Sequence, residues 1–447
     1  MSKLSPARAL ALDILSYARK NDSYAKEVLH ASEKYTSLSP EDRGFASKLV
    51  FGVSSSYGVL DECINFYLSK PTKLAPSVRD ALRISTFELL YLEKSPHAAV
   101  SQGVELVRSV AHRASGLANA VLRKIADNKD SFLYSGKDQT EILAKQSGFN
   151  YKFAKLIVDS IGEDACSDLM RAQTEPAPVY VYLLDDKKVE IDQNNLEPIA
   201  GLERSYKVLN ASDFTQNFDE SYAVVMDASA QYVSRIALGV GRGNMLEVGS
   251  GRGTKSSLFA SIIKDRQLDL DLVCLEQFAY KNEIAKKRIA PLTDKLPNFI
   301  SADATQDLSS VLSPDFDTVF IDAPCSGSGT LRRHPELVWS TNKEKLASLQ
   351  ALQFKILSNC SQYVKAGGEL IYATCSVLQA ENEELIEKFL ASKAGQDFEL
   401  ESVLEREGLE EAFLDEFSKH TQGSYFRHQV KKGGPDGHFC ARLIKKR

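Results

Sequence analysis

The stretch Met245-Leu246-Glu247-Val248-Gly249-Ser250-Gly251-Arg252-Gly253-Thr254-Lys255 predicts the architecture of the C-terminal half of the chain. Its apolar beginning, residues 245–248, is typical of a short buried β-strand. Three glycines at alternate positions follow at once, and residues 256–263 then show a helical pattern. Glycine allows a backbone to turn sharply and to approach a ligand closely. The stretch therefore predicts a strand, a ligand-binding loop and a helix in succession.

Similar units recur downstream of this stretch. Further apolar runs, each long enough for a strand, lie at residues 270–275, 298–300, 318–321 and 370–373, and helical patterns cover residues 343–364 and 380–392. Strands and helices that alternate at this spacing are typical of βαβ units, so we predict an α/β, Rossmann-like domain with a mainly parallel sheet. Residues 424–430 and 438–444 are expected to add an antiparallel edge.

An acidic residue ends each of the next three predicted strands: Glu276, Asp303 and Asp322. In an open α/β sheet, ligands bind outside the carboxyl ends of the strands. A carboxylate at Glu276 can accept both hydroxyls of a ribose, and Asp303 can reach an adenine edge or the ribose. These residues predict a nucleoside pocket. The glycine spacing matches neither the GxGxxG of dinucleotide enzymes nor a P-loop, which leaves NAD and S-adenosylmethionine both open.

Two of the seven cysteines, Cys325 and Cys375, stand just after predicted strands. Cys375 lies between Thr374 and Ser376, and hydroxyl donors together with helix N-termini lower the pKa of a thiol and create a nucleophile. The cysteines show no CxxC or zinc-type spacing, so no metal site is expected, and scattered thiols in odd number fit a reduced, cytoplasmic compartment. The remaining cysteines are expected to be core residues: Cys63, Cys166, Cys274, Cys360 and Cys440.

The N-terminal half differs from the C-terminal half in its pattern. Helical periodicity without β alternation predicts an all-helical unit, and Ser39-Pro40 is a strong helix start. Residues 127–131 are polar and are interpreted as a linker, and residues 150–159 and 163–172 are predicted helices. The predicted division of the chain is a helical domain at residues 1–130, a small mixed domain at residues 139–225 and the α/β domain at residues 226–447.

The charge balance limits the kind of partner. The formal net charge is −5, which argues against a globally basic nucleic-acid binder. Residues 1–130 nevertheless carry 18 Lys and Arg against 14 Asp and Glu, so RNA contacts are expected to use local patches and this part of the chain. No apolar run approaches the roughly 18 residues of a membrane span, and residues 1–6 lack the apolar region of a signal peptide. Membrane association is not expected.

Three motifs around the strand-end residues resemble a known family. Asp322-Ala323-Pro324-Cys325-Ser326, Arg332-Arg333-His334-Pro335-Glu336 and Tyr372-Ala373-Thr374-Cys375-Ser376 resemble the motifs of RNA 5-methylcytosine methyltransferases of the Sun/RsmB type. Residues 225–231 are similar to the entry of that family's catalytic domain. Residues 117–123 are similar to the last helix of its NusB-like domain, so the resemblance extends over the whole chain.

The resemblance implies an activity and a role for each motif residue. The expected activity is methylation of carbon 5 of a cytosine in RNA, most naturally small-subunit ribosomal RNA, by a monomeric enzyme. Cys375 would attack carbon 6, Cys325 would assist release of the product, and Asp322 would hold the cytosine ring at N3. Arg332, Arg333 and His334 would contact RNA. The residues expected to hold S-adenosylmethionine are Gly249, Ser250, Gly251, Arg252, Gly253, Thr254, Lys255, Glu276, Asp303 and Asp322.

The glycine loop departs from the family pattern. The family's motif ends in Pro-Gly-Gly-Lys, whereas this chain has Arg252-Gly253-Thr254-Lys255. This departure keeps open a non-catalytic RNA-binding factor with a decayed donor site. A nicotinamide oxidoreductase would use the same loop and Glu276, but it offers no reason for two strand-end cysteines.

Overall fold

The computed structural model of the chain describes residues 4–21, 23–68, 70, 73–92, 95–184, 193–211, 214, 223–313 and 315–447. The chain forms two compact units. The first comprises Met1–Asp159 together with Leu331–Asn342, and the second comprises Ser160–Thr330 together with Lys343–Arg447. The division into three domains stays a prediction, and its middle domain includes residues 185–192 and 215–222, which lie outside the described residues.

The first unit is helical, as expected. Its elements are α1 (Pro6–Asn21), α2 (Ala25–His30), α3 (Glu33–Thr36), α4 (Pro40–Phe66), α5 (Pro76–Tyr91), α6 (Pro96–Val110), η2 (His112–Ala114), α7 (Ser115–Leu133), α8 (Gln139–Ser147) and α14 (Leu337–Ser340). Helix α4 begins where the sequence predicts, because Ser39 Oγ accepts a hydrogen bond from the Asp42 N–H at 3.2 Å and Pro40 occupies the first helical position. Buried aliphatic side chains of α1, α4, α5, α6 and α7 form one core.

The interpretation of residues 127–131 as a linker is wrong. Helix α7 continues through them and only kinks at Asn128, where φ is −126°. Ile125 before the polar stretch and Phe132 and Leu133 after it are all buried in the core of the first unit, so packing on both sides extends the helix across it. The two helices predicted at residues 150–159 and 163–172 are present as α9 (Tyr151–Ala172), which is interrupted at Gly162 with φ of 83°.

The second unit contains, after the end of α9, a small antiparallel sheet of four described strands. These are β1 (Val179–Leu183), β2 (Leu196–Pro198), β3 (Ser205–Val208) and β4 (Ala223–Val225), in the order β2-β3-β1-β4. Val181, Leu183, Val208 and Ala223 pack together on one face of this sheet.

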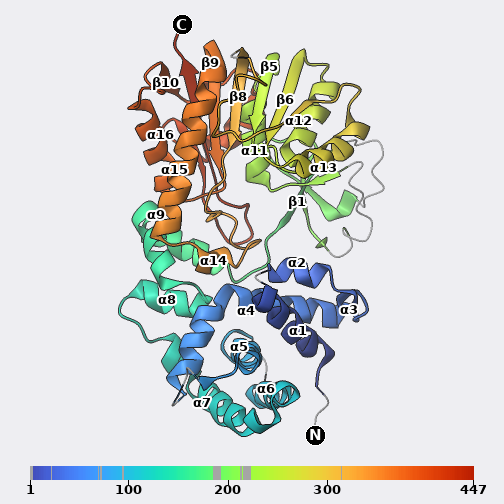
Figure 1. Cartoon of the computed structure of the whole chain (residues 1–447), viewed down its shortest axis with the longest axis vertical. Coiled ribbons are helices and arrows are strands. Elements are labelled where there is room, and N and C mark those ends of the chain that lie inside the picture. The colour runs from blue at the N-terminus through green and yellow to red at the C-terminus, as the bar shows by residue number, and fades with distance from the viewer. Residues whose placement is uncertain are drawn as a thin grey trace. The chain divides into compact units, whose positions relative to one another are not determined.

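A larger sheet forms the centre of the second unit (Figure 1). Its parallel strands are β5 (Gly243–Val248), β6 (Leu270–Glu276), β7 (Asn298–Ser301), β8 (Phe316–Asp322) and β9 (Val364–Thr374). Strands β10 (Phe398–Glu401), β11 (Thr421–Gln422), β12 (Tyr425–His428) and β13 (His438–Lys445) add an antiparallel edge, and the strand order is β11-β12-β13-β9-β8-β5-β6-β7, with β10 paired to β13. The predicted α/β, Rossmann-like class is confirmed.

Helices cover both faces of this sheet because alternate side chains of each strand point to opposite faces. Met245, Phe320 and Ile371 pack with α11 (Ala228–Leu238) and α12 (Thr254–Asp265). Leu246, Val319 and Leu370, one position away in each strand, pack with α15 (Lys343–Cys360) and α16 (Glu383–Leu390). The described part of this unit also contains α13 (Ala279–Ile289), α17 (Glu411–Ser418) and the end of α9, with short 3₁₀ turns between elements.

The strand order creates a switch point. The chain moves outward from β5 through β6 to β7, returns to the other side of β5 as β8, and continues to β9. The crevice at the carboxyl ends of β5 and β8 is the place where doubly wound folds bind ligands. No helix in the described ranges has both the length and the apolar content needed to cross a membrane.

Candidate functional site at the carboxyl ends of the sheet

The glycine loop lies at this switch point. Gly249 follows β5 with φ of +82°, and a Cβ placed on it would lie 2.6 Å from the carbonyl oxygen of Asp322 at the end of β8. Only glycine permits this approach of two backbones. Gly253 precedes α12 with φ of +79°, and a Cβ there would lie 2.7 Å from Ala285 Cβ of α13. The first and third glycines therefore bring the loop against β8 and bring α12 against α13.

Two of the predicted strand-end acids lie on the side of β5 where β6 and β7 follow. Glu276 ends β6, and Asp303 follows β7. Glu276 is 6% exposed, and its carboxylate accepts hydrogen bonds from the Gly251 N–H and the Phe278 N–H, each at 3.0 Å. Lys281 Nζ lies 3.3 Å from the same carboxylate. At Asp303, which follows β7, a hydrogen bond from the Thr305 N–H lowers the pKa and keeps the carboxylate ionised.

The third acid, Asp322, is paired with a residue of the glycine-loop stretch. Lys255 Nζ donates to Asp322 Oδ2 at 2.6 Å, and the Lys255 side chain is only 14% exposed. Burial lowers the pKa of this ammonium, but the charge and the hydrogen bond of Asp322 raise it more, so the net pKa lies above its ordinary value. A cation and an anion are thus held together at the end of β8.

A buried carboxyl group on β5 binds the first turn of α12, the helix that follows the glycine loop. Glu247 on β5 is 1% exposed and accepts a hydrogen bond from Ser256 Oγ of α12 at 2.5 Å. Cys274 Sγ of β6 lies 3.5 Å from the same oxygen. Burial raises the pKa of Glu247 to about 7, and the hydrogen bond from Ser256 connects the strand to the helix that follows the loop.

The two strand-end thiols are in contact. Strands β8 and β9 are parallel neighbours with Asp322 opposite Ala373, which places Cys325 and Cys375 just beyond the paired residues. Their sulfur atoms are 3.2 Å apart, and both residues are partly exposed. The hydrogen bond to Cys375, together with burial, raises the pKa of Cys325 well above its ordinary value. The arrangement keeps Cys325 as a protonated thiol beside Cys375.

The other five cysteines are all buried, which confirms the expectation that they are core residues: Cys63, Cys166, Cys274, Cys360 and Cys440. Burial raises the pKa of Cys63, Cys360 and Cys440 to about 12 in each case. These thiols therefore lack the nucleophilic form at neutral pH.

Two polar residues behind the thiols were missed by sequence reasoning. Glu381 and Asn382 lie between β9 and α16, are fully buried, and bind the segments that follow Cys325 and Cys375. The interpretation of residues 380–392 as one helix is wrong here, because Gln379–Glu381 forms a 3₁₀ turn and Asn382 has φ of −117° and ψ of −105°. Glu381 and Asn382 stand in a polar run, residues 381–384, that is typical of an exposed helix start, so the sequence carries no signal that marks them as buried.

The predicted RNA-contacting residues Arg332, Arg333 and His334 lie in the segment Leu331–Asn342, which belongs to the first compact unit. Trp339 holds this segment there: its indole N–H donates to the Ser55 carbonyl of α4 at 2.6 Å, and its ring lies 5.0 Å from the ring of Tyr57. The lack of a side chain at Gly58 makes room for the indole.

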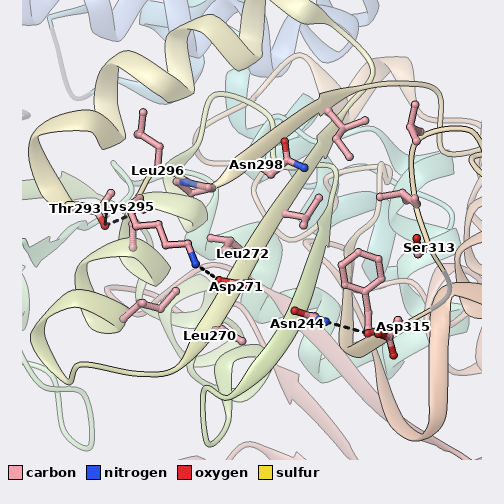
Figure 2. Close-up of a pocket in the computed structure, with 18 residues that line it drawn as sticks. Asn244, Leu270, Asp271, Leu272, Thr293, Lys295, Leu296, Asn298, Ser313 and Asp315 are labelled. Atoms are coloured by element: carbon pink, nitrogen blue, oxygen red, sulfur yellow. Dashed lines mark hydrogen bonds and ion pairs between the residues drawn. The ribbon is translucent and has the colours of Figure 1, made fainter.

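A separate pocket of about 460 Å³ lies at the opposite ends of the strands (Figure 2). It is lined by residues at the beginnings of β5, β6, β7 and β8, including Asn244, Leu270, Asn298 and Phe316. Lys295 and Asp271 form an ion pair at its rim. This pocket contains none of the predicted site residues, whose strand-end members lie at the opposite edge of the sheet.

Comparison with known protein families gives one match in the N-terminal part of the chain and one in the C-terminal part. Residues 241–444 match the family described as 16S rRNA methyltransferase RsmB/F, and residues 5–127 match the NusB family. The chain is 27% identical to the probable ribosomal RNA small subunit methyltransferase B of Bacillus subtilis, over 99% of this chain and 100% of that protein. It is 28% identical to the protein of the same name in Synechocystis, over 86% of this chain and 89% of that protein.

Solved structures share the fold. The crystal structure of PH0851 superposes with a TM-score of 0.73 at 20% identity and covers 99% of this chain and 100% of that chain. The crystal structure of NSun6 from Pyrococcus horikoshii superposes with a TM-score of 0.53 at 12% identity and covers 67% of this chain and 99% of that chain.

Proposed function

Residues 241–444 belong to the RsmB/F family of rRNA methyltransferases and residues 5–127 to the NusB family, and on this premise we propose that the chain methylates carbon 5 of a cytosine in small-subunit ribosomal RNA through a covalent bond to Cys375. Family membership makes it an S-adenosylmethionine-dependent rRNA methyltransferase. The observation that carries the finer proposal is the contact between Cys325 and Cys375, whose sulfurs lie 3.2 Å apart at the ends of adjacent parallel strands.

The residues of the crevice fit S-adenosylmethionine. The close approach of Gly249 to the end of β8 fixes the course of the loop, and at Gly251 an added Cβ would meet no atom nearer than 3.9 Å, which leaves room for a ligand against the backbone. Glu276, at the end of β6, presents a carboxylate with two oxygens that can each accept more than one hydrogen bond, which suits ribose hydroxyls. Asp303, at the end of β7, would meet the adenosine on the same edge. When bound, S-adenosylmethionine supplies an electrophilic methyl group.

The two thiols would provide the nucleophile and the assistance with product release that methylation of cytosine requires. Carbon 5 of cytosine is a poor nucleophile, and addition of the Cys375 thiolate to carbon 6 makes carbon 5 enamine-like. After methyl transfer a base takes the proton from carbon 5, the bond between sulfur and carbon 6 breaks, and Cys375 leaves as a thiolate. Cys325, held as a thiol beside Cys375, assists that release.

Lys255 and Asp322 provide charge where the adduct needs it. Addition at carbon 6 places negative charge on the N3 and O2 side of the ring. Asp322 would hold the ring at N3 by donating a proton to it, and the ammonium of Lys255, 2.6 Å from the carboxylate, would supply that proton to Asp322 as the charge develops. Lys255 therefore has a second role beside the cofactor-binding one predicted from the sequence.

RNA recognition is assigned to the segment Leu331–Asn342. Arg332 and Arg333 carry guanidinium groups, which bind phosphates and stack on unpaired bases. A base must leave its stack to reach a thiol, so the substrate is a single-stranded or flipped cytosine. His334 Nδ1 lies 3.6 Å from Glu336, which supports a role in ordering this segment.

The proposal is tested with labelled S-adenosylmethionine and small-subunit ribosomal RNA, comparing wild type with Cys375→Ala and Cys325→Ala. Methyl transfer should fall by at least about 1,000-fold in Cys375→Ala, because the nucleophile is lost. Cys325→Ala should accumulate a protein–RNA adduct that survives denaturing electrophoresis. Cys360→Ala, which removes a buried thiol at the end of α15, is the matched control and should keep wild-type activity.

Each result bears on a different part of the proposal. Activity retained in Cys375→Ala would refute the choice of nucleophile. An adduct in Cys375→Ala rather than in Cys325→Ala would exchange the two roles. Failure of the wild-type protein to methylate any RNA would favour the alternative of a non-catalytic RNA-binding factor, to which the altered sequence Arg252-Gly253-Thr254-Lys255 points.

A further inference from the structure

The side chain of Glu381 connects the two segments that carry the thiols. It is fully buried in the 3₁₀ turn Gln379–Glu381. One carboxylate oxygen accepts from Ser326 Oγ at 2.5 Å and from Ser376 Oγ at 2.6 Å. Ser326 directly follows Cys325, and Ser376 directly follows Cys375. A single oxygen atom therefore joins the residues next to both thiols.

The second carboxylate oxygen of Glu381 also accepts two hydrogen bonds. It accepts from the Ser326 N–H at 2.8 Å and from Gln353 Nε2 of α15 at 2.9 Å. A carboxylate offers about four acceptor positions, and here all four are filled by donors. Within the part of the chain that the structure describes, no Lys or Arg forms an ion pair with Glu381, so these hydrogen bonds alone compensate its burial.

Neighbouring side chains reinforce the connection. Asn382 accepts from Thr374 Oγ1 at 2.6 Å and donates to the Ser376 carbonyl at 2.9 Å, which fixes the backbone on both sides of Cys375. Ser328 Oγ lies 2.9 Å from Ser376 Oγ and accepts from the Val377 N–H at 2.9 Å. These bonds hold the segment after β8 against the segment after β9.

We propose that Glu381 is a positioning residue that sets the separation of the Cys325 and Cys375 sulfurs by binding Ser326 and Ser376 together. Its importance for methylation rests on the proposed function, because attack by one thiol and release by the other require both sulfurs to reach the same base. The separation itself is a property of the protein alone. A displacement of about 1 Å at reacting groups lowers a rate by about 100-fold, so a carboxylate that fixes two thiols has a large effect on catalysis.

A chemical cross-link measures the separation without RNA. Diamide oxidises two adjacent thiols to a disulfide and takes up the two hydrogens at its nitrogen–nitrogen double bond. The rate of the Cys325–Cys375 disulfide, read by peptide mass spectrometry, reports how often the sulfurs meet. We compare wild type, Glu381→Ala, Glu381→Gln and Ser376→Ala. Glu383→Ala is the matched control, since Glu383 lies two residues away and pairs with Arg427 instead.

Glu381→Ala should slow the disulfide at least about tenfold and lower kcat for methylation by about 100-fold, with KM for RNA and for S-adenosylmethionine changed by less than about threefold. Glu381→Gln should recover most of both rates, because the amide oxygen still accepts and the serine hydroxyls can turn to accept from the amide nitrogen. Ser376→Ala, which keeps the buried carboxylate, should slow the disulfide as well and serves if Glu381→Ala does not fold. Glu383→Ala should match wild type.

The outcomes separate the two proposals. A wild-type disulfide rate in Glu381→Ala and Ser376→Ala overturns the positioning role, whatever happens to methylation. A slowed disulfide in these variants, combined with a wild-type protein that does not methylate RNA, supports the positioning role and refutes the proposed function. Loss of methylation through KM alone also overturns the positioning role, because it would place Glu381 in substrate binding.

Discussion

Glutamine at position 247 should change how the stability of the second unit depends on pH. Glu247 is 1% exposed, and burial raises its pKa from an ordinary 4.5 to about 7. The folded protein therefore binds this proton more tightly than the unfolded chain does. Its contribution to stability is complete below the unfolded pKa and is lost as pH rises through the folded pKa. Glutamine is neutral at every pH and lacks this dependence.

The magnitude follows from the two pKa values. One pKa unit corresponds to about 1.4 kcal/mol, so the whole shift is worth about 3 kcal/mol, and about 2 kcal/mol of it is lost between about pH 5.5 and about pH 8. Relative to wild type, Glu247→Gln should gain about 2 kcal/mol in free energy of unfolding over the same interval. Any constant cost of the altered hydrogen bonds to Ser256 and Cys274 cancels in this comparison.

Labelling of Cys274 in urea measures the relevant free energy, because this thiol is fully buried beside Glu247 and becomes reactive when the sheet opens. Mass spectrometry of the Cys274 peptide at each urea concentration gives the unfolding free energy of this unit at each pH. Glu399→Gln, at an exposed position of β10, is the control and should show no such change. An unfolding free-energy difference between Glu247→Gln and wild type that is the same at both pH values would refute the reasoning.

Two further variants address the loop and the Trp339 contact. Gly249→Ala should weaken S-adenosylmethionine binding at least about tenfold by calorimetry, because the new Cβ would lie 2.6 Å from the Asp322 carbonyl oxygen and the left-handed backbone would add about 1–2 kcal/mol of strain. Gly423→Ala, at a position with φ of +61° and no atom within 4 Å, is the control for backbone strain alone. Equal affinity for S-adenosylmethionine in the two variants would contradict the role of the contact with Asp322. Trp339→Ala should lower the free energy of unfolding of the first unit by about 3 kcal/mol. It should also weaken RNA binding in a filter assay and leave the affinity for S-adenosylmethionine unchanged. Unchanged RNA affinity would show that the segment Leu331–Asn342 does not contribute to RNA binding.

Much of the fold follows from local patterns. The apolar runs at residues 245–248, 270–275 and 318–321 are strands, and the helix start at Ser39 is correct, because these features depend on neighbours in the sequence. The prediction of a linker at residues 127–131 is wrong because the structure there depends on residues that are distant in the sequence. Its polar composition is local, but the helix continues there because Ile125, Phe132 and Leu133 are buried by residues far away in the sequence.

The sequence by itself determined which chemical groups the site contains and that each stands at the end of a strand. Three glycines, three acids and two thiols could be assigned to one edge of a parallel sheet, because apolar runs show where strands end and all parallel strands end at the same edge. Local periodicity carries no information about which strands are neighbours. That β8 lies between β5 and β9 is decided by the packing of both faces of the sheet against helices.

Only the tertiary structure decided the distances within the site, and therefore the roles of residues that have no motif of their own. The order of the strands places Cys325 against Cys375 and Lys255 against Asp322. It also brings the buried carboxylate of Glu381 to the serines that follow both thiols. In the sequence Glu381 is one acid among many; it becomes a positioning residue because two chain segments 50 residues apart supply its hydrogen-bond donors.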